Sequence, residues 1–542
     1  MPSIYTFFYT VFKTSLLLLS FSQLLIAQSS HNSANLFIYG VASGDPLQER
    51  VIIWTRISPP NDLQPIVVSY YVAKDSGFQQ IINQGKLSTH ADKDFTIKVD
   101  VTGLEAGQTY FYHFEAFGQA SPIGRTKTAT KNSQEKLRFA VMSCSNYEDG
   151  YFHAYRHVAQ QTNLNAIIHL GDYIYESFYT TKRKTRDHLP AKELITLHEY
   201  RQRYAQYHLD ADLQEAHRLH PFISVWDDHE ASNNAYKDGA IYHTAENGKW
   251  ENRLTNAKKA YFEWMPIRNH PQQRVYRKIS YGNLMDLIML DTRLEGREQQ
   301  VKNTEDERFL DSSRTMLGVA QRAWLLSSLD SSKAKWKVIG NQVIFSPLYG
   351  RHIHSRAESL LLDIWNGYPA ERLKITQFLR ENQINNTLFI TGDFHSSLVF
   401  EVPVDDWNYP LTATGPDYEV ETGEHAVAVE FVTPSITSQN FDEFSLYAIP
   451  FRPFGRFVAK FVERKFLKAS IRDKQMPDKR RTINPHLKWT NLRAHGYMTL
   501  TLTPQKAQVD YYFVDKPWKK NVQFRHAKKF EVKEGANRLS RD

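Results

Sequence analysis

Three apolar, β-branched runs of this chain end abruptly in side chains that can bind metal ions. The runs are NAIIHLGDYIYE, PFISVWDDHEASNN and NTLFITGDFHSS, which carry Asp172, Asp228 and Asp393 in that order. A buried strand that ends in such residues places oxygen and imidazole groups at the carboxyl edge of a sheet, where open α/β sheets hold their ligands. Three of these runs in a chain with one cysteine predict a metal cluster built from strand ends.

The order of the remaining segments indicates two domains and a C-terminal extension. Short alternating strands with intervening turns predict a small β-sandwich over residues 35–130, with Tyr110 in GLEAGQTYFY as a corner tyrosine of the fibronectin type III kind. From Leu137 strands alternate with helical stretches, which predicts a layered α/β catalytic domain over residues 137–515. Residues 516–542 are expected to form a basic tail.

The first 27 residues are typical of a cleaved signal peptide rather than of the fold. Lys13 precedes the apolar stretch SLLLLSFSQLLIA, which is too short to span a bilayer, and Ala27 offers a small-residue cleavage site. An uncleaved membrane anchor is the alternative. Nothing later in the chain is apolar enough for a transmembrane segment. We therefore expect a periplasmic or secreted protein.

Positive charge is concentrated in residues 451–481. This segment holds eleven Lys or Arg against three acids, an excess that equals the net charge of +8 for the whole chain. Its basic residues recur every fourth position between Arg452 and Arg472, with apolar residues between them, which predicts an amphipathic helix. The helix could attract an anionic lipid or polymer surface, or it could be a solvated face over a packed one. No recognised nucleic-acid-binding module accompanies the charge, so we expect no specific nucleic-acid partner.

The side chains at the three run ends suit hard cations. Asp172 can bridge two cations, and Tyr175 becomes a ligand if a metal such as Fe(III) lowers the pKa of its phenol. A tyrosine packed with its hydroxyl on the backbone is the other interpretation. Asp393 and His395 are two residues apart in an extended segment and therefore point the same way.

WDDHEASNN offers more acids than one site can use. We take Asp228, His229 and Asn233 as the candidates, whereas Asp227 and Glu230 could cap a helix or orient the loop.

Four further residues are candidates, and two of them, Cys144 and Arg293, have two interpretations each. Cys144 follows the strand-like run LRFAVMS, where we favour a metal thiolate over a small buried side chain. Arg293 in LMLDTR could bind a phosphate as a planar fork, or it could pair with Asp291. Asp363 and Asn366 could serve a second cation. The chain lacks the G-x-S-x-G turn of a serine triad and a phosphate-binding Gly loop, which leaves metal-activated hydroxide as the expected nucleophile.

Taken together, these motifs resemble the alkaline phosphatase D (PhoD-like) family. The similarity runs from GVASGDPLQERVIIWTR, at Gly40, to about Asp515, and its landmarks include SCSNYEDGYF, AYFEWMPIR, WKVIGNQVIFSP, WNGYPAER and NPHLKW. The resemblance implies a β-sandwich followed by a calcineurin-like metallophosphoesterase core with α/β/β/α layers. It implies hydrolysis of phosphate monoesters with Fe(3+) and Ca(2+) as cofactors.

The resemblance also implies roles for individual residues. Cys144, Asp172, Tyr175, Asp393 and His395 would serve iron or the bridging position, and Asp228 and Asn233 would help bind calcium. Asp172, His229 and Arg293 are the expected catalytic residues, and the basic segment 451–481 would cover the site entrance. One departure is the absence of the twin-arginine export signature that is frequent in this family.

Two other functions remain open. One is a phosphodiesterase or phospholipase-type activity on nucleotide, lipid or polymer diesters. The other is a catalytically inactive adhesion or glycan-binding protein, against which the intact set of ligand residues argues.

Overall fold

The computed structural model describes residues 35–59, 65–132, 135–177, 184–350, 352–353, 357–404, 418–444, 452–472, 480–514 and 516–541. Residues 1–27, for which a signal peptide is expected, lie outside the described part.

Two large sheets form the catalytic part of the molecule. The first has nine strands in the order β23 (Phe524–Lys533), β22 (Lys506–Val514), β21 (His495–Leu502), β9 (Leu137–Met142), β10 (Ala166–His169), β11 (Phe222–Ser224), β1 (Val41–Gly44), β2 (Arg50–Arg56) and β5 (Thr96–Thr102). The second has seven strands in the order β12 (Arg277–Tyr281), β13 (Met285–Met289), β14 (Trp336–Asn341), β15 (Thr387–Thr391), β17 (Ala428–Val432), β16 (Ser397–Val402) and β20 (Leu487–Asn491). Strands β9, β10 and β11 are parallel, as are β13, β14, β15 and β17, so their carboxyl ends meet at shared edges.

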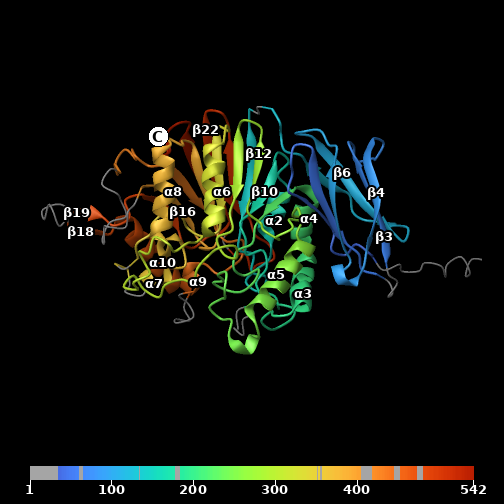
Figure 1. The fold of residues 1–542 in the computed structure, drawn as a ribbon, viewed down its shortest axis with the longest axis horizontal. Coiled ribbons are helices and arrows are strands. Elements are labelled where there is room, and N and C mark those ends of the chain that lie inside the picture. Colours follow the sequence, from blue (N-terminus) through green and yellow to red (C-terminus); the bar gives the residue numbers. More distant parts are fainter. Residues whose placement is uncertain are drawn as a thin grey trace, which may run out of the picture.

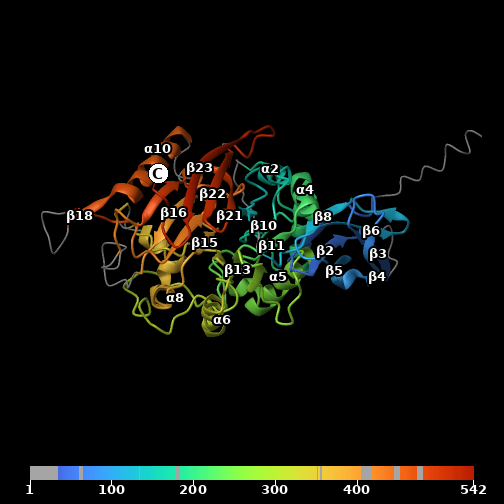
Figure 2. The same cartoon turned by 90° about the horizontal axis from the view of Figure 1, so that it is seen from above.

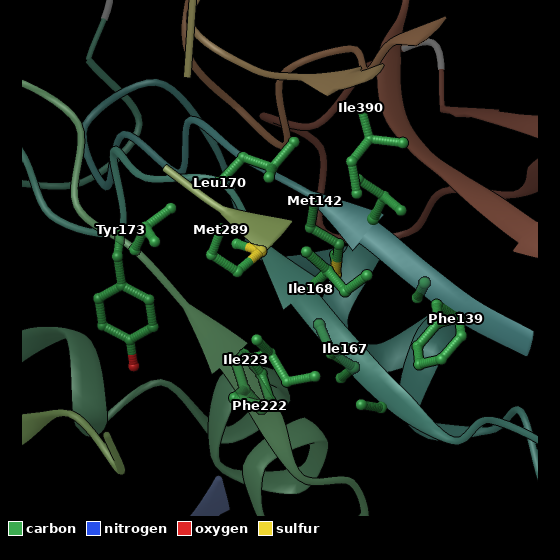
Figure 3. Packing of buried hydrophobic residues seen from close by; sticks show 14 of the residues in the cluster. Phe139, Met142, Ile167, Ile168, Leu170, Tyr173, Phe222, Ile223, Met289 and Ile390 are labelled. Atoms are coloured by element: carbon green, nitrogen blue, oxygen red, sulfur yellow. The ribbon is translucent and has the colours of Figure 1, made fainter. Parts of the chain in front are cut away.

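The two sheets pack face to face. Met142 and Leu170, from β9 and the end of β10, lie beside Met289 and Ile390 of the other sheet (Figure 3). All four side chains are fully buried. Dense apolar packing of this kind stabilises the layered core and fixes the strand ends relative to one another.

Helices cover the outer faces of both sheets (Figure 1). On the nine-stranded sheet these are α2 (His153–Ala159), α3 (Leu197–His208), α4 (Ala211–Leu219) and α5 (Trp250–Trp264). On the seven-stranded sheet they are α6 (Gly318–Asp330), α8 (Pro369–Glu381) and α10 (Arg452–Lys468). Shorter helices are α7 (Ala357–Leu360), α9 (Phe441–Phe444), η1 (Ala91–Lys93), η2 (Ala245–Asn247) and η3 (Trp365–Gly367). The predicted α/β/β/α layering is thereby confirmed.

The predicted N-terminal β-sandwich is also present. Its second sheet contains β4 (Ile81–Thr89), β3 (Ile66–Ala73), β6 (Thr109–Ala116), β7 (Gln119–Ala120) and β8 (Gly124–Lys127). The hydroxyl of Tyr110 accepts a hydrogen bond from the backbone N–H of Glu105 at 2.8 Å, as a corner tyrosine does.

The other sheet of this sandwich continues into the catalytic domain. Strand β1 pairs with β11 in parallel at Gly44 and Phe222, so β1, β2 and β5 extend the nine-stranded sheet. Ion pairs reinforce the junction, with Arg277 Nε 3.0 Å from Asp45 Oδ1 and Arg268 Nε 3.0 Å from Asp100 Oδ2. The sandwich is therefore joined to the catalytic layers through its backbone and its side chains.

Two segments differ from their predicted form. Residues 516–541 are not a tail, because β23 within them pairs with β22. The many Lys and Arg residues of this strand make the inward-facing Phe530 and Val532 hard to recognise in the sequence. The predicted helix in residues 451–481 ends at Lys468, and Arg472 lies in a two-stranded sheet of β18 (Ser470–Arg472) and β19 (Arg480–Thr482). Among the residues described, no helix is long and apolar enough to cross a membrane.

Candidate metal centre

The strand ends β9, β10 and β15 converge as predicted and share an unusual backbone conformation. Cys144, Asp172, Asp393 and His395 have φ values of 62°, 56°, 59° and 53°. Residues other than glycine rarely adopt positive φ, and such conformations concentrate at functional sites. Four of them directly after strand ends indicate that the fold aims these side chains at one place.

Glycine 171 allows two of these loops to touch. A Cβ at this position would lie 2.4 Å from the backbone N of Asp227, which real Cβ atoms do not tolerate. Gly171 also has a φ of 101°. The loop after β10 can therefore lie directly on the loop after β11.

Three overlapping groups of side chains have the geometry of metal ligands. In each group the ligand atoms lie within 4.8 Å of one another. The groups are Cys144, Asp172 and His395; Asp172, Asp228 and His229; and Asp227, Asp228 and Asp393. Asp172 links the first two groups and Asp228 links the last two, so the three form one continuous cluster.

Tyr175 adds a phenol to the first group, in which the ring of His395 has a defined orientation. The Tyr175 hydroxyl donates to Asp172 Oδ2 at 2.8 Å and lies 3.1 Å from His395 Nε2. His395 Nδ1 lies 2.9 Å from the carbonyl oxygen of Gln439, which can only accept, so Nδ1 carries a proton and the lone pair of Nε2 faces the cluster. Ser438 donates to the Tyr175 hydroxyl at 2.6 Å.

His229 is oriented by a buried acid that the sequence interpretation missed. Its Nδ1 lies 2.6 Å from Glu176 Oε2, and Glu176 Oε1 accepts the backbone N–H of Asn233 at 2.7 Å. Burial opposes the charge on His229, but the carboxylates of Glu176, Asp172 and Asp228 outweigh it and raise its pKa well above the ordinary value. Asn233 itself is half-buried at the border of the cluster.

Arg293 lies among the carboxylates rather than at an open surface. Its side chain is fully buried and donates from Nε to Asp227 at 2.5 Å, from Nη1 to Asp363 at 2.8 Å and from Nη2 to Asp393 at 2.9 Å. The alternative pairing with Asp291 is wrong. The Asp291 carboxylate accepts the backbone N–H of Arg293 instead, because a turn after β13 folds the chain back on it. Arg293 could bind a phosphate only if one of its three ion pairs, with Asp227, Asp363 or Asp393, were broken.

Asp363 and Asn366, which are expected from the sequence to bind a second cation, instead make separate structural contacts. Asp363 is occupied by Arg293, Arg297 and Gln300. The side-chain amide of Asn366 accepts a hydrogen bond from the backbone N–H of Leu348 and donates one to its carbonyl oxygen, which fixes a loop. Neither residue belongs to the candidate ligand groups.

Asp227 and Glu230 are more central than the sequence indicated. Asp227 belongs to a ligand group, and the Glu230 carboxylate accepts the backbone N–H groups of Asp172, Tyr173 and Asp227 at 3.1, 2.6 and 2.8 Å. The adjacent acids in WDDHE indicate a cation site, but which of these acids face the site depends on how the loops pack and cannot be predicted from the sequence. Glu230 thus holds the loops after β10 and β11 together.

The cluster has an excess of negative charge. Burial and the carboxylates of Asp363, Asp228 and Asp172 raise the pKa of Asp393 to about 7, although Arg293 opposes the shift. Burial raises the pKa of Asp227 well above its usual range, with Asp228 adding to the effect and Arg293 opposing it. Cations bound among these groups would relieve the repulsion.

The chemistry of the donors fits metal ions. Asp172 Oδ1, Asp227 Oδ2 and Asp228 Oδ1 are buried without a hydrogen-bond partner, a costly arrangement unless a ligand satisfies them. Thiol, phenol and imidazole donors surround one end of the cluster and carboxylates the other. The residues present therefore suit two neighbouring cations, a transition metal at the thiol, phenol and imidazole end and a hard cation at the carboxylate end.

Comparisons with known proteins agree with this architecture. Residues 139–511 match the PhoD-like phosphatase family, and residues 23–130 match its N-terminal domain. The chain is 34% identical over 505 residues to alkaline phosphatase D of Bacillus subtilis (strain 168), covering 88% of this chain and 77% of that protein. A solved structure described as PhoD superposes with a TM-score of 0.78 at 30% identity and covers 94% of this chain and 93% of that one. With both of its regions matched and its strand ends converging on one carboxylate cluster, this chain belongs to the PhoD-like phosphatases and is a phosphate-ester hydrolase.

Proposed function

We propose that this enzyme is an exported, metal-dependent phosphatase that hydrolyses phosphate monoesters at the cluster around Asp172. The observation that carries the proposal is the set of three buried, unpartnered carboxylate oxygens on Asp172, Asp227 and Asp228. Buried carboxylate oxygens that accept no hydrogen bond destabilise a fold, so their retention at converging strand ends supports a site for cations.

The donor types support two kinds of metal. Cys144, Asp172, Tyr175 and His395 would hold Fe(III), because thiolate, phenolate and imidazole suit a transition metal. The oxygen donors of Asp228 and Asp393, with Asn233 at the border of the cluster, would hold Ca(2+). Such ions, when bound, lower the pKa of water and neutralise charge on phosphate oxygens.

The protein side chains then have three tasks. Asp172 fixes the relative position of the two ligand groups that share it. Glu176 holds the Nδ1 proton of His229 and so orients the ring beside Asp172 and Asp228, where it would act on the phosphate. Arg293 keeps Asp227 and Asp393 in place through its guanidinium group.

An Asp172→Asn variant tests the proposal. We expect hydrolysis of a nitrophenyl phosphate to be abolished and the metal content, measured by elemental analysis per chain, to fall. Asp286→Asn is a control, because Asp286 is also buried but bonds Ser280 and Ser332 and pairs with Lys278, near the opposite ends of the strands. Near-normal turnover of Asp172→Asn would contradict the assignment.

Hydrolysis of diesters is the second candidate, and the basic helix α10 favours it. A lipid or polymer diester carries negative charge along its length and would be attracted by residues 451–481. The ratio of rates on a nitrophenyl monoester and a bis-nitrophenyl diester distinguishes the two candidates.

Export is proposed from the signal-like residues 1–27. The periplasm or the medium should then contain a mature chain that begins near Gln28, which N-terminal sequencing of each cell fraction would detect. Recovery of the full-length chain in the cytoplasm alone would contradict export.

A further inference from the structure

Helix α10 has one face packed into the protein and one face in solvent. Ala459, Val462 and Phe466 are buried in the core over the seven-stranded sheet. They recur at helical spacing, so they form one stripe along the helix. The opposite side of α10 carries exposed side chains.

The outer face combines aromatic and basic side chains. Phe457 and Phe461 are 67% and 49% exposed, although phenylalanine is usually buried. They are one turn apart and therefore neighbours on the helix surface. Exposed cations surround them, namely Arg456, Lys460, Arg464 and Lys468.

Among the described residues, few acids offset these cations, and Arg456 is the one of the four that pairs with an acid of α9, Asp442. Glu463 is the one acid of α10, and its carboxylate is bonded to Arg493 at 2.9 Å and to the backbone N–H of Leu492 at 2.8 Å. The neighbouring pair of strands β18 and β19 adds the exposed Arg472 and Arg480. The outer face is therefore positive as well as partly apolar.

Helix α10 lies at the end of the molecule away from the N-terminal sandwich. Figure 2 shows α10 and β18 at the end of the molecule opposite β3 and β4. Helix α10 packs on α9, with Arg456 Nε 3.6 Å from Asp442 Oδ2. Helix α9 begins two residues after Gln439, whose carbonyl bonds His395. Helix α10 is thus connected to the metal centre through α9 and the contact of Gln439 with His395.

Two partners suit positive charge, but only one of them suits the phenylalanines. A soluble polyanion would need the cations alone. A bilayer with anionic headgroups attracts the cations and also accepts aromatic rings at the boundary between headgroups and acyl chains. The exposure of Phe457 and Phe461 between the cations favours the bilayer.

We propose that the outer face of α10 docks the enzyme onto an anionic phospholipid bilayer. The inference rests on the proposed function for one point, that the substrates brought to the site are phosphate esters at that surface. Docking itself does not require turnover, so it can be measured separately.

Flotation of the full-length mature enzyme with lipid vesicles tests the proposal. We expect binding to vesicles of phosphatidylcholine mixed with phosphatidylglycerol and little binding to phosphatidylcholine alone. Phe457→Ser combined with Phe461→Ser should weaken binding roughly tenfold or more, since two interfacial rings are lost. Lys460→Ser and Arg464→Ser should each weaken it roughly fivefold at low salt.

Phe117→Ser is the matched control for the aromatic change. Phe117 is 52% exposed but lies in the N-terminal sandwich, so its loss should leave vesicle binding unchanged. The circular dichroism spectrum and the urea denaturation midpoint of all the α10 variants should match those of the wild type, which shows that they fold.

Specific outcomes would overturn the proposal. One is wild-type enzyme that ignores anionic vesicles, or that binds neutral ones equally well. Another is that the double phenylalanine variant binds vesicles as tightly as the wild type and that soluble polyphosphate displaces both proteins from the vesicles. Charge alone would then explain the interaction. Asp172→Asn should still dock; an inactive wild-type enzyme that docks would contradict the proposed function but not this surface.

Discussion

Glu230 offers a quantitative test of how the loops at the metal centre are held. Its buried carboxylate accepts three backbone N–H groups, from Asp172 and Asp227 at one oxygen and from Tyr173 at the other. Glu230→Gln keeps one accepting oxygen, and we expect this oxygen to retain Asp172 and Asp227. The amide nitrogen would then face the N–H of Tyr173, and leaving that donor unsatisfied costs about 1–3 kcal/mol.

The stability loss should come with a loss of function. A small shift of the two loops separates Asp172 from Asp227, so we expect Glu230→Gln to retain less metal and to lose roughly tenfold or more in turnover. Urea denaturation, elemental analysis and the nitrophenyl phosphate assay measure the three effects on the same preparation.

A second buried carboxylate provides the control. Glu371 accepts the backbone N–H groups of Met316 and Leu317 and lies on α8, away from the ligand groups. Glu371→Gln should lose a similar amount of stability while its turnover and metal content stay normal. If the two variants behaved alike in turnover and metal content, the role assigned to Glu230 would be refuted.

Three further predictions concern the metals, Arg293 and acid stability. Dialysis against EDTA should abolish hydrolysis, and calcium should restore it; full activity after chelation would exclude the metal requirement. Arg293→Lys should retain less metal by elemental analysis, because one ammonium group cannot replace three separate bonds to Asp227, Asp363 and Asp393. Burial lowers the pKa of His208 and His486 to about 3, below the unfolded value, so the unfolded chain takes up these protons first. The contribution of these two histidines to the free energy of unfolding should therefore be constant above pH ~6.5 and fall as the pH drops toward 3. Urea titrations should show a loss of about 2 kcal/mol for each histidine at pH ~5, and a flat profile between pH ~7 and ~5 would contradict it.

The sequence predicted the elements of the site better than their contacts. Runs of β-branched residues that end in Asp or His define strand ends, and parallel strands bring those ends together, so Asp172, Asp228 and Asp393 could be assigned to one place. The partner of Arg293 could not, because a guanidinium group reaches several carboxylates equally well until packing selects among them.

Residues that act through the backbone were the hardest to predict. Glu176 and Glu230 bond main-chain N–H groups of other loops, and no spacing in the sequence reveals such a contact. Strand β23 escaped prediction for a different reason. Its pairing depends on the exposed edge of β22, while its own sequence is mostly charged.

The shared sheet has a consequence for how this chain can be cut or recombined. A truncation that began near residue 137 would remove β1 and leave β11 as an open edge with unsatisfied main-chain groups. Such a fragment should aggregate rather than behave as a minimal enzyme, and a foreign sandwich grafted in its place would fail unless it supplied an equivalent strand. The two regions are separable along the sequence, but because they share one sheet we expect them to unfold as a single cooperative unit.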